Sequence, residues 1–97
     1  MKKLILLLLF IPLVSFGQTA TEYFDSGYDK AEAKDYYGAI SDYNKAIELD
    51  PDYTSPYVNR GIAKELINDL TGACLDWKKA ASLGHTNSAK WVANQCN

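Results

Sequence analysis

Three side chains near the C-terminal end of the chain could bind a metal ion or form a disulfide: Cys74, His85 and Cys96. His85 lies about ten residues along a helix from either cysteine, which is roughly 15 Å at 1.5 Å per residue. Two sulfurs and one imidazole that far apart cannot share a tetrahedral ion. We therefore expect no metal site, and we expect no other cofactor.

The remaining candidates for chemistry are carboxylates. No glycine-rich phosphate loop and no HExxH helix are present, and no nucleophile is spaced to pair with the single histidine. We expect a solvated acidic surface and no enzymatic activity. This surface would include the helical residues Asp25, Asp29, Asp42 and Asp76.

The segment 1–17 has the layout of a secretory signal peptide. Met1, Lys2 and Lys3 form a positive region, an apolar run follows up to Val14, and small residues precede Gln18. The apolar run is short for a transmembrane span, so the alternative of an uncleaved anchor is less favoured. We expect cleavage after Gly17, no stable membrane anchor afterwards, and a location in the bacterial periplasm or outside the cell.

Cleavage would leave the segment 18–97, which has eight basic and twelve acidic side chains and therefore a net charge of −4. An acidic domain lacks the basic surface that nucleic acids require, so we expect no nucleic-acid partner. A hydrophobic core of this size is marginal without a crosslink or a partner.

The mature chain repeats itself once at a constant offset in residue number. Matched pairs include Tyr23 with Tyr57 and Gly27 with Gly61. Asp35 matches Asp69, and the aromatic Tyr43 matches Trp77. A helical face recurs in both copies, because Ala39, Tyr43 and Ala46 are spaced at i, i+4 and i+7, as are Ala73, Trp77 and Ala80. The pattern predicts two copies of one helix–turn–helix unit.

Each unit resembles a tetratricopeptide repeat, whose length of about 34 residues equals this offset. The residues that carry the resemblance are Tyr23, Gly27, Ala39, Tyr43, Ala46 and Pro51 in the first unit and Tyr57, Gly61, Ala73, Trp77 and Ala80 in the second. His85 stands where the second unit would have its proline, and Trp91 begins a third unit. The resemblance implies an all-α fold, a right-handed α-solenoid fragment, rather than a generic helical bundle.

We predict repeat one at about residues 20–53, repeat two at about 54–87 and a capping helix at about 88–96. Helix ends are predicted at Pro51 and at Gly84, which suits a left-handed conformation. Helix starts are predicted from residues that can cap an N-terminus: Thr19 with Glu22, Asp35, Ser55 before Pro56, and Asn87 or Ser88.

The two cysteines flank the last predicted turn almost symmetrically. Residues equidistant from the turn of a helical hairpin lie at the same height, so Cys74 and Cys96 could meet. Export would favour oxidation. We predict a disulfide that attaches the terminal helix, with two independent buried cysteines as the alternative.

The resemblance also implies that the first helix of each unit lines an inner, concave surface. Its predicted partner-binding residues are Phe24, Tyr28, Val58, Asn59, Ile62 and Val92, of which all but Asn59 would form an apolar strip. Exposed apolar strips commonly mark interaction sites. Two functions follow as hypotheses: a module that binds a protein or peptide, and a structural unit that forms a homodimer through the strip.

Overall fold

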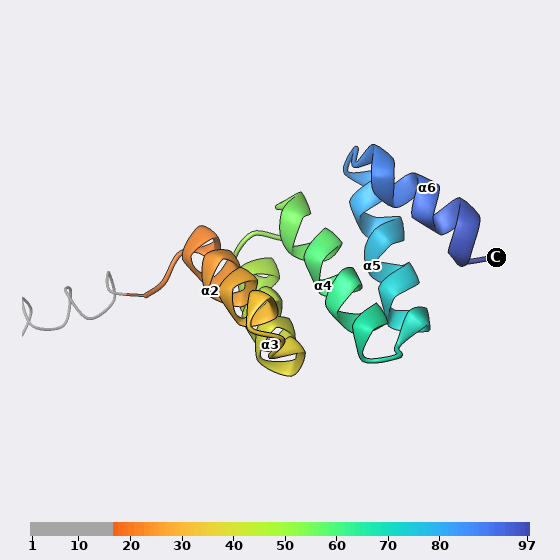
Figure 1. Ribbon diagram of the computed structural model, residues 1–97. Helices are drawn as coiled ribbons and strands as arrows, with labels where there is room; N and C mark the ends of the chain where they lie inside the picture. Colours follow the sequence, from red (N-terminus) through yellow and green to blue (C-terminus); the bar gives the residue numbers. More distant parts are fainter. Residues whose placement is uncertain (1–16) are drawn as a thin grey trace, which may run out of the picture.

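The computed structural model describes residues 17–97, so the predicted signal peptide lies outside the described residues except for Gly17. The described chain forms five helices and contains no strand (Figure 1). These are α2 (Ala20–Glu32), α3 (Tyr36–Leu49), α4 (Thr54–Leu66), α5 (Leu70–Ser82) and α6 (Thr86–Gln95). The all-α fold predicted from the sequence is confirmed. None of the described helices has the length and apolar character needed to cross a bilayer.

The helices pack in chain order. Helix α2 pairs with α3 and α4 pairs with α5, while α4 packs against α3 and α6 packs against α5 (Figure 1). The only other helix pair with more than marginal contact among the described residues is α2 with α4. This serial arrangement is that of stacked helix–turn–helix repeats rather than a closed bundle.

Side-chain caps start four of the five helices. Thr19 and Glu22 form a capping box on α2, and Asp35 and Asp69 accept hydrogen bonds from the backbone N–H groups of Gly38 and Gly72. The imidazole of His85 caps α6.

Two predicted helix starts were wrong. Helix α4 begins at Thr54 after Tyr53, which makes no side-chain cap, so Ser55 lies inside the first turn. Helix α6 begins at Thr86 rather than near residue 88, because the Nδ1 atom of His85 accepts from the Ser88 N–H at 3.1 Å. Its hydrogen bond also shows that His85 is a structural residue and not a free turn side chain.

Three helices end on a left-handed residue. Lys34, Asn68 and Gly84 have φ values of 67°, 69° and 104°. After Lys34 and Asn68, the next N–H reaches back to the carbonyl oxygens of Lys30 and Lys64 at 2.8 Å. This bond characterises the Schellman end of a helix. The predicted left-handed Gly84 is confirmed, while the same geometry at a lysine was not anticipated.

The core of each repeat is one aromatic ring packed on a glycine. Tyr43 lies against Gly27 and Trp77 lies against Gly61, so closely that an added Cβ at either glycine would collide with the ring. Ala39, Ala46, Ala73 and Ala80 fill the remaining space and are fully buried. The structure therefore uses the repeated small and aromatic positions to bring the two helices of each pair together.

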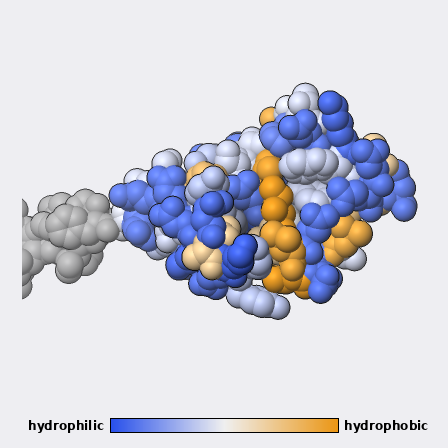
Figure 2. All heavy atoms as spheres, viewed as in Figure 1, coloured by the Kyte–Doolittle hydropathy of each residue, from blue (hydrophilic) through white to orange (hydrophobic). Residues whose placement is uncertain are grey.

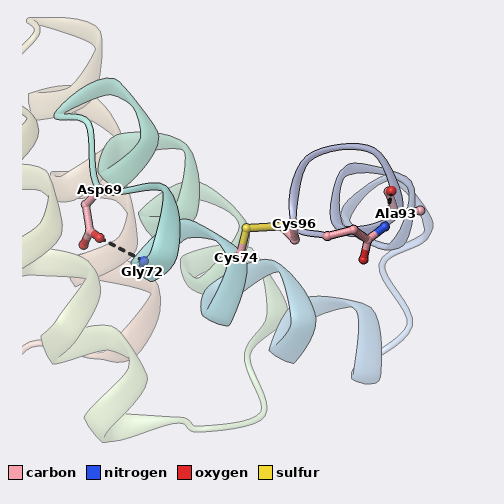
Figure 3. The surroundings of a disulfide bond; sticks show 6 residues. Asp69, Gly72, Cys74, Ala93 and Cys96 are labelled. Atoms are coloured by element: carbon pink, nitrogen blue, oxygen red, sulfur yellow. Dashed lines mark hydrogen bonds between the residues drawn. A yellow bond between two sulfur atoms is a disulfide. The ribbon is translucent and has the colours of Figure 1, made fainter.

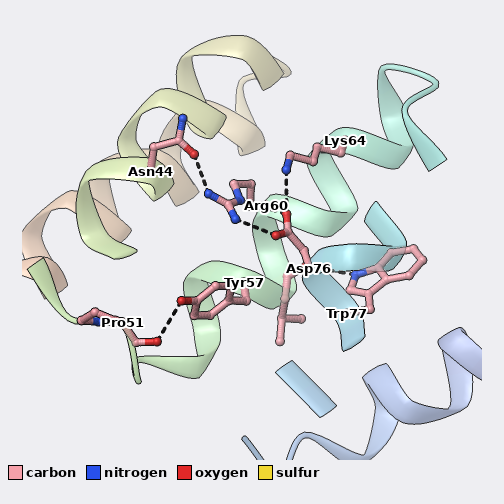
Figure 4. A network of polar contacts seen from close by, with 8 residues as sticks. Asn44, Pro51, Tyr57, Arg60, Lys64, Asp76 and Trp77 are labelled. Carbon is pink, nitrogen blue, oxygen red and sulfur yellow. Dashed lines mark hydrogen bonds and ion pairs between the residues drawn. The ribbon is translucent and has the colours of Figure 1, made fainter. Parts of the chain in front are cut away.

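A carboxylate links the helices of each pair; Asp76 is buried and Asp42 is partly buried. Asp76 accepts from Arg60 Nε and Nη2 at 2.9 and 2.6 Å and lies 3.1 Å from Lys64 Nζ (Figure 4). One repeat earlier, Asp42 accepts a hydrogen bond from the Ser26 hydroxyl at 2.6 Å and pairs with the Lys30 ammonium at 3.0 Å.

The prediction that Asp42 and Asp76 are solvated was therefore wrong. Asp76 is only 3% exposed, because cations on the partner helix replace its hydration. The donors occupy matched positions: Lys64 aligns with Lys30 in the register of the repeat, and Arg60 aligns with the hydroxyl donor Ser26.

A disulfide between Cys74 and Cys96 fastens the end of α6 to α5 (Figure 3). The Cα atoms are 5.7 Å apart, within the usual range for the bond. In the register of the repeat, the two cysteines take the positions of Ile40 and Ile62. A covalent link thus stands at the junction where the preceding repeat has two aliphatic residues.

Candidate functional site

The predicted apolar strip is only partly exposed. Tyr28 and Ile62 are 48% and 37% exposed, and Asn59 is half-buried. Val58 is only 8% exposed, because it packs with Tyr57 and Ala80 in the core. Assigning Val58 to a free binding surface was therefore wrong.

Phe24 is part of an aromatic cluster instead of a free surface. Its ring centroid lies 5.7 Å from Tyr43, 5.6 Å from Tyr53 and 6.3 Å from Tyr28. Tilted rings at these distances attract one another. Phe24 therefore joins α2 to α3 and to the start of α4, and it remains partly exposed.

A groove of about 160 Å³ lies between α2 and α4, with the start of α3 beside it. We call it the inter-repeat groove. Three tyrosines, one acid and one amide line it: Tyr28, Tyr36, Tyr43, Glu32 and Asn59. Its aliphatic wall is formed by Ala31, Ile62, Ala63 and Leu66.

Leu66 and Glu32 are exposed groove residues that the sequence prediction missed. Leu66 is 53% exposed and follows Ile62 by four residues, so both side chains lie on the same face of α4. Figure 2 shows an apolar stripe running along α4 on this face. The i, i+4 spacing was visible in the sequence and could have extended the strip to Leu66.

The Tyr43 hydroxyl is an unpaired polar group below the groove. Tyr43 is fully buried, and within the described residues its Oη atom makes no hydrogen bond. Burial raises the pKa of Tyr43, and the nearby Asn59 amide opposes that rise without reaching hydrogen-bond geometry. The corresponding Trp77 is satisfied, since its Nε1 donates to the Val58 carbonyl at 3.3 Å. An unpaired buried hydroxyl costs about 1–3 kcal/mol, so its retention needs an explanation.

A second groove continues the first along the same side of α4. Ile62, Glu65, Trp77, Trp91 and Gln95 line it, and Ile62 is shared with the inter-repeat groove. The predicted contact residue Val92 is half-buried and is not part of either lining. The structure therefore brings Tyr28, Asn59 and Ile62 together in the lining of the inter-repeat groove, whereas Phe24, Val58 and Val92 do not line it.

Comparisons with known proteins find similarity to tetratricopeptide repeat proteins. Residues 27–67 match the family model described as TPR repeat. The chain is 41% identical over 70 residues to a tetratricopeptide repeat protein 36 homolog of Nematostella vectensis. The matched region covers 72% of this chain and 39% of that protein. It is 40% identical over 57 residues to tetratricopeptide repeat protein 36 of Mus musculus. That matched region covers 59% of this chain and 31% of the relative. The chain thus spans less than half the length of these relatives.

Proposed function

We propose that this chain, whose repeats and relatives support the tetratricopeptide repeat family, is a non-catalytic module that binds a protein or peptide on its α2–α4 face. Tetratricopeptide repeats generally mediate protein–protein interactions. The observation that carries the proposal is the inter-repeat groove, where Tyr28, Ile62 and Leu66 are exposed beside one another.

The size of the groove favours a peptide over a small-molecule ligand. Sites for small molecules usually enclose about 300–1,000 Å³. The inter-repeat groove has about 160 Å³ and is open to solvent. A cavity of about 150 Å³ accepts a group the size of benzene, which is comparable with one side chain. A partner segment would place single side chains in this groove and in the second groove beside it.

Export is a second part of the proposal. The arrangement of residues 1–17 supports a cleaved signal peptide, and the Cys74–Cys96 disulfide suits an oxidising compartment. Sequencing the N-terminus of the protein recovered from outside the cytoplasm tests this part. We expect Gln18 as the first residue; an intact Met1 would contradict cleavage.

Site-specific photocrosslinking tests the binding face. A photoreactive phenylalanine analogue at position 66 would report on the groove, and the same analogue at position 37 would serve as a control. Both native side chains are exposed, Leu66 by 53% and Tyr37 by 72%, but Tyr37 does not line the groove. We expect crosslinks to a different protein from position 66 only.

Two outcomes would contradict the proposal. Crosslinks from position 66 to a second copy of the chain would support the alternative, a homodimer joined through the apolar strip. Equal crosslinking from positions 37 and 66 would show that the groove is not the binding surface. Light scattering of the purified protein measures the dimer independently.

A further inference from the structure

We propose that the inter-repeat groove receives a lysine side chain of the partner protein. This inference rests on the proposed function and specifies the chemistry that the groove recognises. Two observations carry it: the groove offers oxygen acceptors but no lysine or arginine among the residues that line it, and the Tyr43 hydroxyl has no hydrogen-bond partner among the described residues.

The walls of the groove match the apolar stem of a lysine. Long cationic side chains lay their methylene groups along apolar surface and keep the charged end in a polar environment. Tyr28, Ile62 and Leu66 provide such a surface at the mouth of the groove. The volume of about 160 Å³ suits one side chain and excludes a second beside it.

The polar end of the groove matches an ammonium group. A lysine ammonium has three donors and no acceptor. The groove offers the Glu32 carboxylate, the Asn59 amide oxygen and the Tyr43 hydroxyl, and each can accept one bond. Tyr28 and Tyr36 add aromatic rings, which attract cations through their faces.

Within the part of the chain that the structure describes, no cation fills this role. None of the described residues that line the groove is a lysine or arginine. The cations of α2 and α4 closest in sequence are engaged elsewhere: Lys30 pairs with Asp42, and Arg60 and Lys64 pair with Asp76. Burial raises the pKa of Tyr43 most, and the neighbouring Tyr28, Asp42 and Glu32 raise it further.

The ligand would reach the Tyr43 hydroxyl by displacing Tyr28. The Tyr43 Oη atom is covered in the free protein, whereas the Tyr28 side chain, which also lines the groove, is 48% exposed. An ammonium at this position would supply the hydrogen bond that Tyr43 lacks. The groove would thus bind lysine more tightly than an uncharged side chain of the same length.

A matched pair of peptides tests the proposal. The probes are acetyl-Gly-Leu-Lys-Leu-Gly-amide and the same peptide with norleucine, which keeps the stem but lacks the ammonium. Titration of the isotope-labelled, oxidised protein by NMR would give Kd and the position of binding. We expect shifts at the amides of Asn59 and Ile62, with the lysine peptide about tenfold tighter because one charge-assisted hydrogen bond contributes about 1.5–3 kcal/mol.

Three variants connect the binding to the proposed contacts. Glu32→Gln removes the carboxylate, and Tyr43→Phe removes only the hydroxyl; we expect each to weaken the lysine peptide about five- to tenfold. Asp29→Asn makes the same charge change on an exposed residue of α2 outside the groove and should alter Kd less than about twofold. Circular dichroism checks that all three remain folded.

Equal affinity for the lysine and norleucine peptides would overturn the lysine proposal, while binding of both at the groove would leave the proposed function intact. Choline chloride that binds as tightly as the lysine peptide would also overturn it, since the ligand would then be a small quaternary ammonium compound. If the photocrosslinking at position 66 also fails, the proposed function is lost with it.

Discussion

Two tyrosines of this protein show how one hydroxyl can stabilise or destabilise a fold. The hydroxyl of Tyr57 donates to the Pro51 carbonyl at 2.8 Å and joins α4 to the end of the first repeat (Figure 4). The hydroxyl of Tyr43 is buried without a partner among the described residues. A made hydrogen bond contributes about 0.5–1.5 kcal/mol, whereas an unmade one in the core costs about 1–3 kcal/mol.

The variants Tyr43→Phe and Tyr57→Phe should therefore change stability in opposite directions. We expect Tyr43→Phe to raise the free energy of unfolding by about 1 kcal/mol and Tyr57→Phe to lower it by about 1 kcal/mol. Urea unfolding at pH 7 measures both. A loss of stability in Tyr43→Phe would mean that its hydroxyl is paired in solution.

The free energy of unfolding should also depend on pH through Tyr43. Burial raises the pKa of Tyr43 in the folded protein above its ordinary value of 10.0. The unfolded chain therefore releases this proton first, so the contribution to stability is complete below pH 10 and is lost as pH rises through the folded pKa. The stability advantage of Tyr43→Phe over the native protein should grow above pH 10. An advantage independent of pH up to 11 would contradict the raised pKa.

The glycine beneath each core aromatic gives another prediction for a single residue. Gly61→Ala would gain about 1 kcal/mol of helix propensity but would force a Cβ into the Trp77 ring. Overpacking costs about 1–3 kcal/mol, so we expect a net loss of stability. Ser55→Ala on the exposed side of α4 is the control and should change stability by less than about 0.5 kcal/mol. Thermal unfolding of both variants decides the question.

The helices meet through turns of nearly identical geometry. Lys34 and Asn68 hold φ at 67° and 69° at matched positions of the two repeats, and Gly84 takes a related conformation after α5. A left-handed backbone costs a lysine more than it costs asparagine or glycine. Of these three residues, Lys34 in the first turn is therefore the least suited to a left-handed backbone conformation.

Replacing the left-handed residues with glycine should stabilise the protein unequally. We expect Lys34→Gly to raise the free energy of unfolding by up to about 1 kcal/mol and Asn68→Gly to raise it by less. Gly84→Ala should lower it. Urea unfolding of the three variants gives the ranking, and a larger gain at position 68 than at position 34 would contradict it.

Local features of the elements could be predicted from the sequence, whereas features that join two elements could not. Thr19, Asp35 and Gly84 act within four residues of themselves, and their roles were read correctly. The burial of Val58 and Asp76 depends on α5 and α4 respectively, so periodicity along one helix does not reveal it. The repeat pairs Lys30 with Lys64 and Asp42 with Asp76, and this match was a usable sign of a repeated ion pair.

The described residues form a stack of helices in which a disulfide links α6 to α5. Helix α6 packs against α5, and the ring centroids of Trp91 and Trp77 are 5.2 Å apart. Each repeat in such a stack gains stability mainly from its neighbours. The Cys74–Cys96 bond adds a covalent link to the packing of α6 against α5.

Reduction of the disulfide should release α6 before the rest of the protein unfolds. The bond closes a loop over a sequence separation of 22 residues. Loop entropy assigns about 3 kcal/mol to such a crosslink. The double variant Cys74→Ser, Cys96→Ser should lose that amount, with faster hydrogen exchange in α6 than in α4. Equal exchange rates in native and variant α6 would contradict an anchoring role.

Ile62 lines both grooves and therefore affects which side chains of a partner segment can bind there together. Because Ile62 lines both grooves, a side chain seated in one groove limits the rotamers with which Ile62 can meet a side chain in the other. The two sites are then thermodynamically linked, and the coupling is reciprocal. A ligand that spans both grooves would be selected by its combination of two side chains, so the preference measured at one position would depend on the residue at the other.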